Sequence, residues 1–266
     1  ESGFIRNQGT SEPDISGDVK RAESLSNLRD KLDEMHPADI AAMLEQLPLD
    51  ERLIVWKFIP SELDGDVLLE VSDAVRETLI ADMDAQELVA ATEQLDADEI
   101  ADLAPNLPEE VIADVFSSLP EEERLQLSAA LSYAEDTVGS LMDFEMVTVR
   151  EDVTLDVVLR YLRRLERLPS NTDKLFVVDR REVLKGVLSV NDLIVSSPET
   201  RVNDVMSTGI VSFYPDRDAE SAAHAFERYD LVSAPVVDAH NRIVGRVTIT
   251  DIVDYIREDA EQESLG

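Results

Sequence analysis

The residues of this chain best suited to chemistry are its carboxylates. Asp and Glu number 58 against 24 Lys and Arg, which gives a net charge of −34 over 266 residues. Carboxylates that lie close together repel one another until a divalent cation neutralises them, and oxygen ligands suit hard cations such as Mg²⁺ and Ca²⁺. An acidic surface is also a general adaptation to a salty cytoplasm, which accounts for most of this charge. Only a subset of the carboxylates is therefore expected to bind cations.

Composition excludes several other classes of site. The chain has no Cys, so disulfides, iron–sulfur clusters and thiolate zinc sites are ruled out. Its three histidines, His36, His224 and His240, are far apart and lack ligand spacing. The acidic balance argues against nucleic acid, because phosphate contacts need Lys and Arg. No catalytic Ser/His/Asp order or phosphate loop is present, so we do not expect an enzyme.

One motif that ends in a carboxylate occurs twice. Gly-x-x-[Ser/Thr]-x-x-Asp spans residues 186–192 and again 245–251, about 59 positions later, which indicates two copies of one structural unit. The hydroxyl of Ser189 or Thr248 can cap a helix there. Asp192 and Asp251 then fall in the first helical turn, where the helix dipole favours a negative charge.

The elements around each motif also repeat. Apolar runs at 175–179 and 183–188, and again at 234–238 and 242–247, flank polar turns and predict two hairpins. Amphipathic helices are expected at 155–165 and 219–229, short strands at 146–149 and 210–213, and a final acidic helix from 252 to about 263. Each copy is too small to close a large core alone, so the two should pack together.

A shorter repeat occupies the N-terminal half. An apolar residue recurs about every 12 positions, and each is followed by a residue suited to a helix start. The apolar positions are Met35, Leu47, Ile59, Val71, Met83, Leu95, Leu107, Leu119 and Leu131. The sixth position of each unit alternates, so the repeating unit is expected to be a helix pair stacked into a superhelix. Such short helices need the stack for stability, and Trp56 is expected inside it.

These patterns predict a domain order. Residues 1–24 are expected to be a disordered tail, 25–132 a helical superhelix and 133–145 a linker. Residues 146–204 form the first α/β module and 205–263 the second. No apolar run is long enough to span a membrane and no signal peptide opens the chain, so we expect a soluble chain from a reducing compartment.

The motifs resemble a known family. The two Gly-x-x-[Ser/Thr]-x-x-Asp hairpin units are similar to a tandem pair of cystathionine β-synthase (CBS) domains. An acidic helical repeat that opens His36-Pro37-Ala38-Asp39, and a connection reading Glu135-Asp136-Thr137-Val138-Gly139-Ser140-Leu141-Met142, precede them. Over about residues 35–263 this order looks like the cytosolic region of MgtE-type magnesium transporters. The implied fold class is α plus α/β: an N-terminal all-α superhelical repeat domain followed by a tandem pair of CBS modules.

The resemblance implies a regulator. It would be a homodimer formed through the CBS modules, at the cytoplasmic face of the membrane, serving a transmembrane pore domain absent from this chain. Mg²⁺ bound between carboxylates of the helical and CBS domains would compact the dimer and favour the closed pore. Low magnesium would loosen the helical domain through repulsion. The charge argument allows this behaviour, although it does not select Mg²⁺ over Ca²⁺.

The resemblance also implies ligands. In the second CBS module the matching acidic positions are Asp218, Glu220, Glu227, Asp230, Asp251, Asp254 and Asp259. In the helical domain they are Asp98, Glu99 and Asp102, which are expected to face Asp251. Ser140 matches a position that offers a backbone carbonyl. For each carboxylate the alternative is a solvated surface acid or a helix-start charge.

Nucleotide binding is the main alternative. CBS pairs often bind adenine nucleotides, and some family members hold ATP with an aromatic residue before the hairpin and an Arg before the motif Asp. Here those positions are Lys174 and Asn191, and Leu231 stands where an aromatic ring would stack on the base. Asp192 remains a candidate for ribose hydroxyls, but the missing groups argue against ATP. The other hypotheses are a CBS adenine-nucleotide sensor and a structural helical-repeat adaptor.

Overall fold

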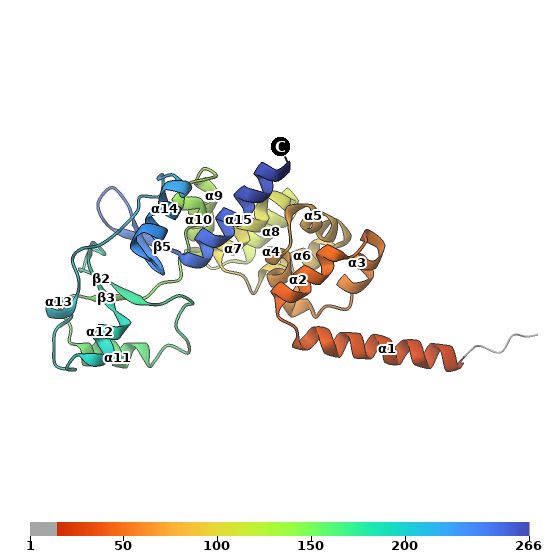
Figure 1. Ribbon diagram of the computed structural model, residues 1–266, viewed down its shortest axis with the longest axis horizontal. Helices are drawn as coiled ribbons and strands as arrows, with labels where there is room; N and C mark the ends of the chain where they lie inside the picture. Colours follow the sequence, from red (N-terminus) through yellow and green to blue (C-terminus); the bar gives the residue numbers. More distant parts are fainter. Residues whose placement is uncertain (1–14, 266) are drawn as a thin grey trace, which may run out of the picture. The chain divides into compact units, whose positions relative to one another are not determined.

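The computed structural model describes residues 15–265, which form two compact units. The first comprises the chain up to Leu95 together with Asp102–Ser118, and the second comprises Asp96–Ala101 and everything from Leu119 onward. Within the described residues, strands occur only in the second unit (Figure 1). Helix α7 (Ala97–Leu103) contributes residues to both units.

The first unit is a series of short helices joined by tight turns, as the repeat predicts. Its α-helices are α1 (Ile15–Glu34), α2 (Pro37–Gln46), α3 (Leu49–Trp56), α4 (Asp64–Glu70), α5 (Asp73–Asp82), α6 (Ala85–Thr92) and α8 (Glu109–Ser118), and its 3₁₀ turns are η1 (Ser61–Leu63) and η2 (Ala104–Asn106). Of the nine apolar residues that punctuate the repeat, Ile59, Val71, Leu95 and Leu107 are buried, whereas Leu131 is 42% exposed. Trp56 is buried as well, as expected.

Helix α1 differs from the expectation of disorder for residues 1–24. It begins at Ile15, so residues 15–24 are helical, while residues 1–14 lie outside the described part of the chain. From Asp18 to Glu34 the sequence contains neither Gly nor Pro, which removes the usual helix breakers. Near the end of the helix, Leu32 is only 1% exposed. One buried anchor and an uninterrupted helix-forming sequence therefore extend the helix beyond the apolar region.

Local chemistry sets the helix starts of the repeat. At α2 the Nδ1 atom of His36 accepts the amide of Ala38 at 3.1 Å. At α6, Asp84 and Glu87 form a complete capping box, in which each side chain accepts the other residue's amide. Such caps satisfy amides that have no partner within the helix.

Two arginines at equivalent repeat positions donate hydrogen bonds to the free carbonyls at the C-terminal ends of helices. Arg52 donates to the carbonyls of Leu44 and Leu47 at the end of α2. Arg76, which is 8% exposed, donates to three carbonyls at the end of α4, those of Leu68, Leu69 and Val71. Each guanidinium therefore ties one helix of a pair to the next.

The second unit contains helix α9 (Glu121–Ser132) and both α/β modules. The first module has β1 (Thr148–Arg150), α11 (Leu155–Leu162), β2 (Lys174–Val178), β3 (Leu184–Ser189) and α12 (Val190–Val195), and the second has α14 (Ala219–Tyr229), β4 (Ser233–Val237), β5 (Ile243–Thr248) and α15 (Ile249–Leu265). Strand β1 runs parallel to β2, which pairs antiparallel with β3. Strands β4 and β5 form the second antiparallel hairpin.

The hairpins and both amphipathic helices are where the sequence predicts them. The expected strand at 210–213 is reduced to a single bridge between Phe213 and Val236. Glu182 and Asn241 occupy the left-handed region in the two hairpin turns, with φ of 62° and 58°. These two residues occupy hairpin-turn positions at which the dipeptide Asn-Gly is usually favoured.

Short helices before each module are exchanged between the modules. Helix α10 (Val138–Leu141) precedes the first module, yet Val138 and Met142 are buried in the core of the second, with Phe213 and Phe226. Helix α13 (Val202–Val205) precedes the second module, yet Val202 is buried in the core of the first. The segment expected to be a linker thus supplies core residues.

Glycines in the central positions of the hairpins permit this exchange. Gly186 in β3 lies against Met206, and Gly245 in β5 lies against Met142. A Cβ at Gly245 would be 2.4 Å from Met142 Cγ, and one at Gly186 would be 2.8 Å from the Ser207 carbonyl oxygen. The glycine of each motif is therefore required so that the exchanged segment can pack closely against the strand, rather than for binding a ligand.

Candidate functional site

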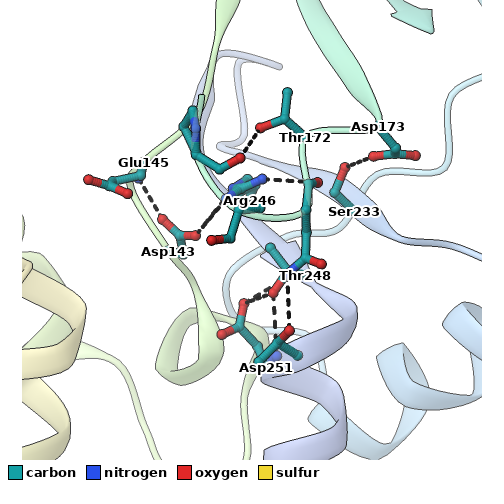
Figure 2. Close-up of polar contacts among 12 residues, drawn as sticks. Asp143, Glu145, Thr172, Asp173, Ser233, Arg246, Thr248 and Asp251 are labelled. Carbon is teal, nitrogen blue, oxygen red and sulfur yellow. Dashed lines mark hydrogen bonds and ion pairs between the residues drawn. The ribbon is translucent and has the colours of Figure 1, made fainter. Parts of the chain in front are cut away.

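The motif aspartate of the second module is held at the start of α15. One carboxylate oxygen of Asp251 accepts the Thr248 amide at 2.9 Å and the Thr248 hydroxyl at 2.8 Å (Figure 2). The Asp251 amide in turn lies 3.4 Å from the Thr248 hydroxyl. The expected capping role of Thr248 is present, and it orients the carboxylate.

Burial and like charge act on a small set of aspartates in the second unit. The pKa of Asp98 is raised to about 9, first by burial and then by negative charges that include Asp143 and Asp251. Burial, with a further contribution from Asp143, raises the pKa of Asp251 to about 6 even though Thr248 stabilises its ionised form. The pKa of Asp96 is also raised, to about 6. Nearby positive charges do not offset the effects of burial and like charge on the pKa of these carboxyls.

Asp143 connects this set to an arginine. Its carboxylate lies 3.1 Å from Nη2 of Arg246, whose side chain is only 4% exposed (Figure 2). Burial raises the pKa of Asp143, while the guanidinium and the amide of Glu145 oppose that rise. Neither Asp143 nor Arg246 was a sequence-predicted site residue. An arginine inside a strand of β-branched residues is the signal that could have identified the pair.

The other predicted ligands on the helical segment have mixed placements. Asp98 belongs to the acidic set described above. Glu99 accepts the Asp96 amide at 2.8 Å, which is a capping contact at the start of α7. Asp102 is exposed and belongs to the first unit. The Ser140 hydroxyl donates to the Thr137 carbonyl at 2.7 Å.

Several predicted ligands of the second module line one groove. This groove, between α14 and α15, has a volume of about 690 Å³, and its apolar lining includes Phe226, Ile252 and Ile256. The predicted ligands among its lining residues are Glu220, Glu227, Asp230 and Asp259. Asp218 caps α14 by accepting the Ser221 amide at 2.9 Å. Asp254 lies 3.5 Å from Arg257, and burial raises its pKa.

These carboxylates do not make a preformed metal cage. Over residues 15–265, no group of three or more Asp, Glu or His side chains is placed closely enough to hold an ion. Asp230 also has a local reason for its position, because it ends α14 in the left-handed conformation with φ of 50°, a role that Asn and Asp tolerate. The acidic set around Asp98 and Asp251 offers the carboxylate oxygens that hard cations prefer.

Internal contacts occupy the region of the predicted nucleotide contacts. Lys174 at the start of β2 donates to the Ser233 carbonyl at 2.8 Å and lies 3.3 Å from Asp173. The Ser233 hydroxyl donates to Asp173 at 2.6 Å (Figure 2). Lys174, Asp173 and Ser233 therefore form a closed network between the modules. Asp192 is exposed, and its amide donates to the Ser189 hydroxyl, which is the expected cap.

One further carboxylate in the first unit has a shifted pKa. Burial raises the pKa of Asp64, at the start of α4, to about 7, and the charges of Glu87 and Glu62 add to the shift. This group was not among the sequence-predicted ligands. It shows that crowding of acids on helix starts extends into the repeat.

Comparison with known proteins decides the family. Residues 35–136 match the MgtE intracellular N domain, and residues 138–199 and 202–258 each match the CBS domain. The crystal structure of the cytosolic domain of the Mg²⁺ channel MgtE in complex with ATP is 32% identical, with a TM-score of 0.78. The match covers 91% of this chain and 98% of that one. The chain belongs to the MgtE family.

Curated MgtE proteins align over the same region. The magnesium transporter MgtE of Thermus thermophilus is 34% identical over 239 residues, 89% of this chain and 53% of its own length. MgtE of Bacillus subtilis is 27% identical over 91% of this chain and 54% of its own length. The chain thus spans about half the length of the MgtE proteins it matches. Within residues 15–265, no helix is long and apolar enough to cross a membrane.

Proposed function

We propose that this chain is the magnesium-sensing regulatory region of an MgtE-type transporter, acting at the cytoplasmic face of the membrane on a pore domain. The observation that carries the proposal is the crowding of Asp98, Asp143 and Asp251: burial raises the pKa of all three carboxyls, and the negative charge of Asp143 adds to the rise at Asp98 and Asp251. A divalent cation with oxygen ligands relieves such repulsion. The names of the relatives, which are magnesium transporters, support Mg²⁺ as that cation.

The regulatory step follows from the position of Asp98. It lies in residues 96–101, which group with the second unit although the residues on both sides group with the first. A cation shared by Asp98 and Asp251 would fasten this segment to the CBS pair, and its loss would leave the carboxylates repelling one another. Magnesium binding is thereby coupled to the freedom of the helical repeat.

Homodimerisation is the second part of the proposal. The helices that carry the two motif aspartates expose large apolar side chains: Ile194 and Val195 of α12 are 70% and 80% exposed, and Val253 and Ile256 of α15 are 55% and 52% exposed. The α14–α15 groove adds an apolar lining. A second CBS pair is the partner that we propose for these faces, and Mg²⁺ would favour the compact dimer.

Limited proteolysis tests the sensor. Glu135 is exposed in the short segment between α9 and α10, and we expect millimolar Mg²⁺ to slow its cleavage by a Glu-specific protease. Ionic strength must be matched with monovalent salt, because screening alone quiets repulsion between surface charges. Equal cleavage rates with and without Mg²⁺ would defeat the proposal.

A ligand variant sharpens this test. Asp251→Asn removes one ligand charge while keeping an oxygen that can accept from Thr248, so the Mg²⁺ midpoint should rise by about tenfold. Asp192→Asn is the matched control, since Asp192 is the equivalent motif residue in the first module and is exposed. An unchanged midpoint in Asp251→Asn would exclude Asp251 as a ligand.

ATP is the second candidate ligand, because the similar MgtE cytosolic domain was crystallised in complex with it. Against it, the Lys174–Asp173–Ser233 network already joins the modules at the position predicted for the base-stacking group. We propose that ATP is not the principal regulator here. Calorimetric titration with Mg-ATP, in a buffer that already contains saturating Mg²⁺, should give no saturable heat, and a binding isotherm abolished by Asp192→Ala would establish the nucleotide hypothesis instead.

A further inference from the structure

Arg246 is the buried cation of the second unit that lies nearest to the acidic set. Its Nε and Nη2 atoms approach one carboxylate oxygen of Asp143 at 3.2 and 3.1 Å. Nη2 also donates to the Ser170 carbonyl at 2.7 Å, and Nη1 donates to the Asn171 carbonyl at 3.3 Å. One guanidinium therefore contacts the segment after α10 and the loop before β2 from a strand of the other module.

The main chain already fixes where Asp143 lies. Its amide donates to the Arg246 carbonyl, and the Arg246 amide donates to the Asp143 carbonyl, both at 2.8 Å. The loop before β2 has a second attachment, because the Asn171 side chain donates to the Thr250 hydroxyl at 3.0 Å. Each segment therefore has an attachment besides the Arg246–Asp143 ion pair. What the ion pair adds is one positive charge beside carboxylates that have few others.

That charge acts on two of the three carboxylates. Arg246 opposes the rise in pKa at Asp143 and at Asp251, while Asp143 raises the pKa of both Asp98 and Asp251. Without the guanidinium, Asp143 would add a full negative charge to this group. A divalent cation would then be attracted more strongly, because its attraction scales with the uncompensated charge nearby.

We propose that Arg246 is a built-in counter-charge which sets the cation concentration at which the acidic set fills. By pairing with Asp143, it lowers the net negative charge around Asp98 and Asp251 and so weakens divalent-cation binding into the range where it can report on changes in the cation. This inference rests on the proposed function, since it assigns a role relative to the same cation. Arg246 is here a positioning and affinity-setting residue, not a ligand.

A four-variant titration with MgCl₂ by calorimetry tests the assignment. Arg246→Gln should tighten Mg²⁺ binding by about tenfold, and Asp143→Asn should weaken it by about tenfold, the order expected for one unit charge near a divalent ion. The double variant Asp143→Asn/Arg246→Gln restores the charge balance, so its midpoint should return to that of the parent. Both single changes disturb a buried ion pair, and damage to the fold alone would move both midpoints in the same direction.

Arg242→Gln is the matched control for net charge. It removes a positive charge four residues away, but Arg242 is about half exposed and pairs loosely with Asp238 at 3.8 Å. Its Mg²⁺ midpoint should equal that of the parent. A shift as large as that of Arg246→Gln would show a general charge effect and overturn the assignment.

The outcomes separate this inference from the proposed function. A parent chain that binds no Mg²⁺ defeats the proposed function, and the inference falls with it. A parent that binds Mg²⁺ with a midpoint unmoved by Arg246→Gln defeats the inference alone, as does a double variant that stays as weak as Asp143→Asn. Should Arg246→Gln fail to fold, Arg246→Lys replaces it: the charge is kept, so a parental midpoint supports the assignment and a tightened one contradicts it.

Discussion

At the scale of single residues, the pKa of the aspartate carboxyl is lowered at some positions of this protein and raised at others. Backbone amides donate to Asp179 and Asp238 in the hairpin turns, and these hydrogen bonds lower the pKa of both carboxyls. The pKa of Asp98 is raised by burial and like charges, and the pKa of Asp251 is raised by burial and by Asp143 even though hydrogen bonds from Thr248 oppose the rise. A carboxylate's role is therefore decided by its neighbours.

The raised pKa of Asp98 predicts a pH dependence of stability. The folded state holds a proton between the unfolded pKa, near 3.8, and the folded pKa of about 9, whereas the unfolded state has released it. The free energy of unfolding should therefore fall as pH rises through this window when divalent cations are absent. Thermal unfolding in EDTA at pH 5 and pH 8, at fixed ionic strength, measures this.

A variant isolates that contribution from the rest of the acidic surface. Asp98→Asn cannot titrate, so its loss of Tm between pH 5 and pH 8 should be smaller than that of the parent. Asp114→Asn, on α8, is a control that should behave like the parent. The prediction is contradicted if the parent and Asp98→Asn lose the same Tm.

At the scale of secondary structure, the contacts made at the helix ends determine how successive helices of the repeat are joined. The 12-residue pattern predicts where helices begin, and the Arg at alternate units satisfies carbonyls where the preceding helix ends. A guanidinium suits this role because its donors form a rigid fork. The periodic arginines are thus connectors between helices of the stack.

Removing one such connector should be costly. Arg76→Gln leaves three carbonyls at the end of α4 without their donor, and we expect a loss of about 2 to 3 kcal/mol in the free energy of unfolding. Arg124 occupies the equivalent repeat position but is exposed, so Arg124→Gln should cost less than about 0.5 kcal/mol. Urea unfolding of both variants tests the difference, and equal losses would show that Arg76 does not act as a connector.

The motif glycines make a second prediction at this scale. Gly186→Ala would place a Cβ 2.8 Å from the Ser207 carbonyl oxygen, which accepts the neighbouring Val187 amide. Relieving that overlap should cost about 1 to 3 kcal/mol. At Gly209 the nearest atom is 3.9 Å away, so Gly209→Ala should leave Tm within a degree or two of the parent (about 0.5 kcal/mol at most). If Gly186→Ala also leaves Tm unchanged, the exchanged segment is not packed rigidly against the strand.

At the scale of the whole molecule, two features remain unsatisfied by one chain: exposed apolar helix faces and a large negative charge. A chain with net charge −34 resists self-association, so the apolar faces of α12 and α15 must outweigh repulsion if a dimer forms. Divalent cations lower that repulsion more effectively than monovalent salt at equal ionic strength.

The dimer proposal predicts a specific interface variant. Val195→Glu replaces a side chain that is 80% exposed, so the fold should persist while the dimer dissociates at least about tenfold more readily in sedimentation velocity. Leu125→Glu is the matched control, because Leu125 is 66% exposed on α9, which is not part of the proposed interface. A dimer that survives Val195→Glu, or is disrupted equally by Leu125→Glu, would contradict this interface.

Much of the fold could be predicted because it depends on local patterns. Periodicity located the helical repeat, alternation and turn residues located both hairpins, and the Ser189 and Thr248 caps followed from spacing alone. Those features arise from interactions within a few residues, which the order of side chains fixes. The helical start of α1 was missed because the scarcity of apolar residues there was given more weight than the sequence from Asp18 onward, which lacks Gly and Pro. The strand expected at 210–213 was missed because strand pairing depends on segments that are distant in the sequence.

The candidate site divides in the same way. The sequence by itself determined that carboxylates stand at helix starts, and its resemblance to the MgtE family singled out Asp98 and Asp251 as expected ligands. Only the tertiary structure decided that Asp143 lies near these two aspartates and that Arg246 pairs with Asp143. It also decided that the segment before one module completes the core of the other. Electrostatic interaction depends on distance through space and on burial, and neither is encoded by separation along the chain.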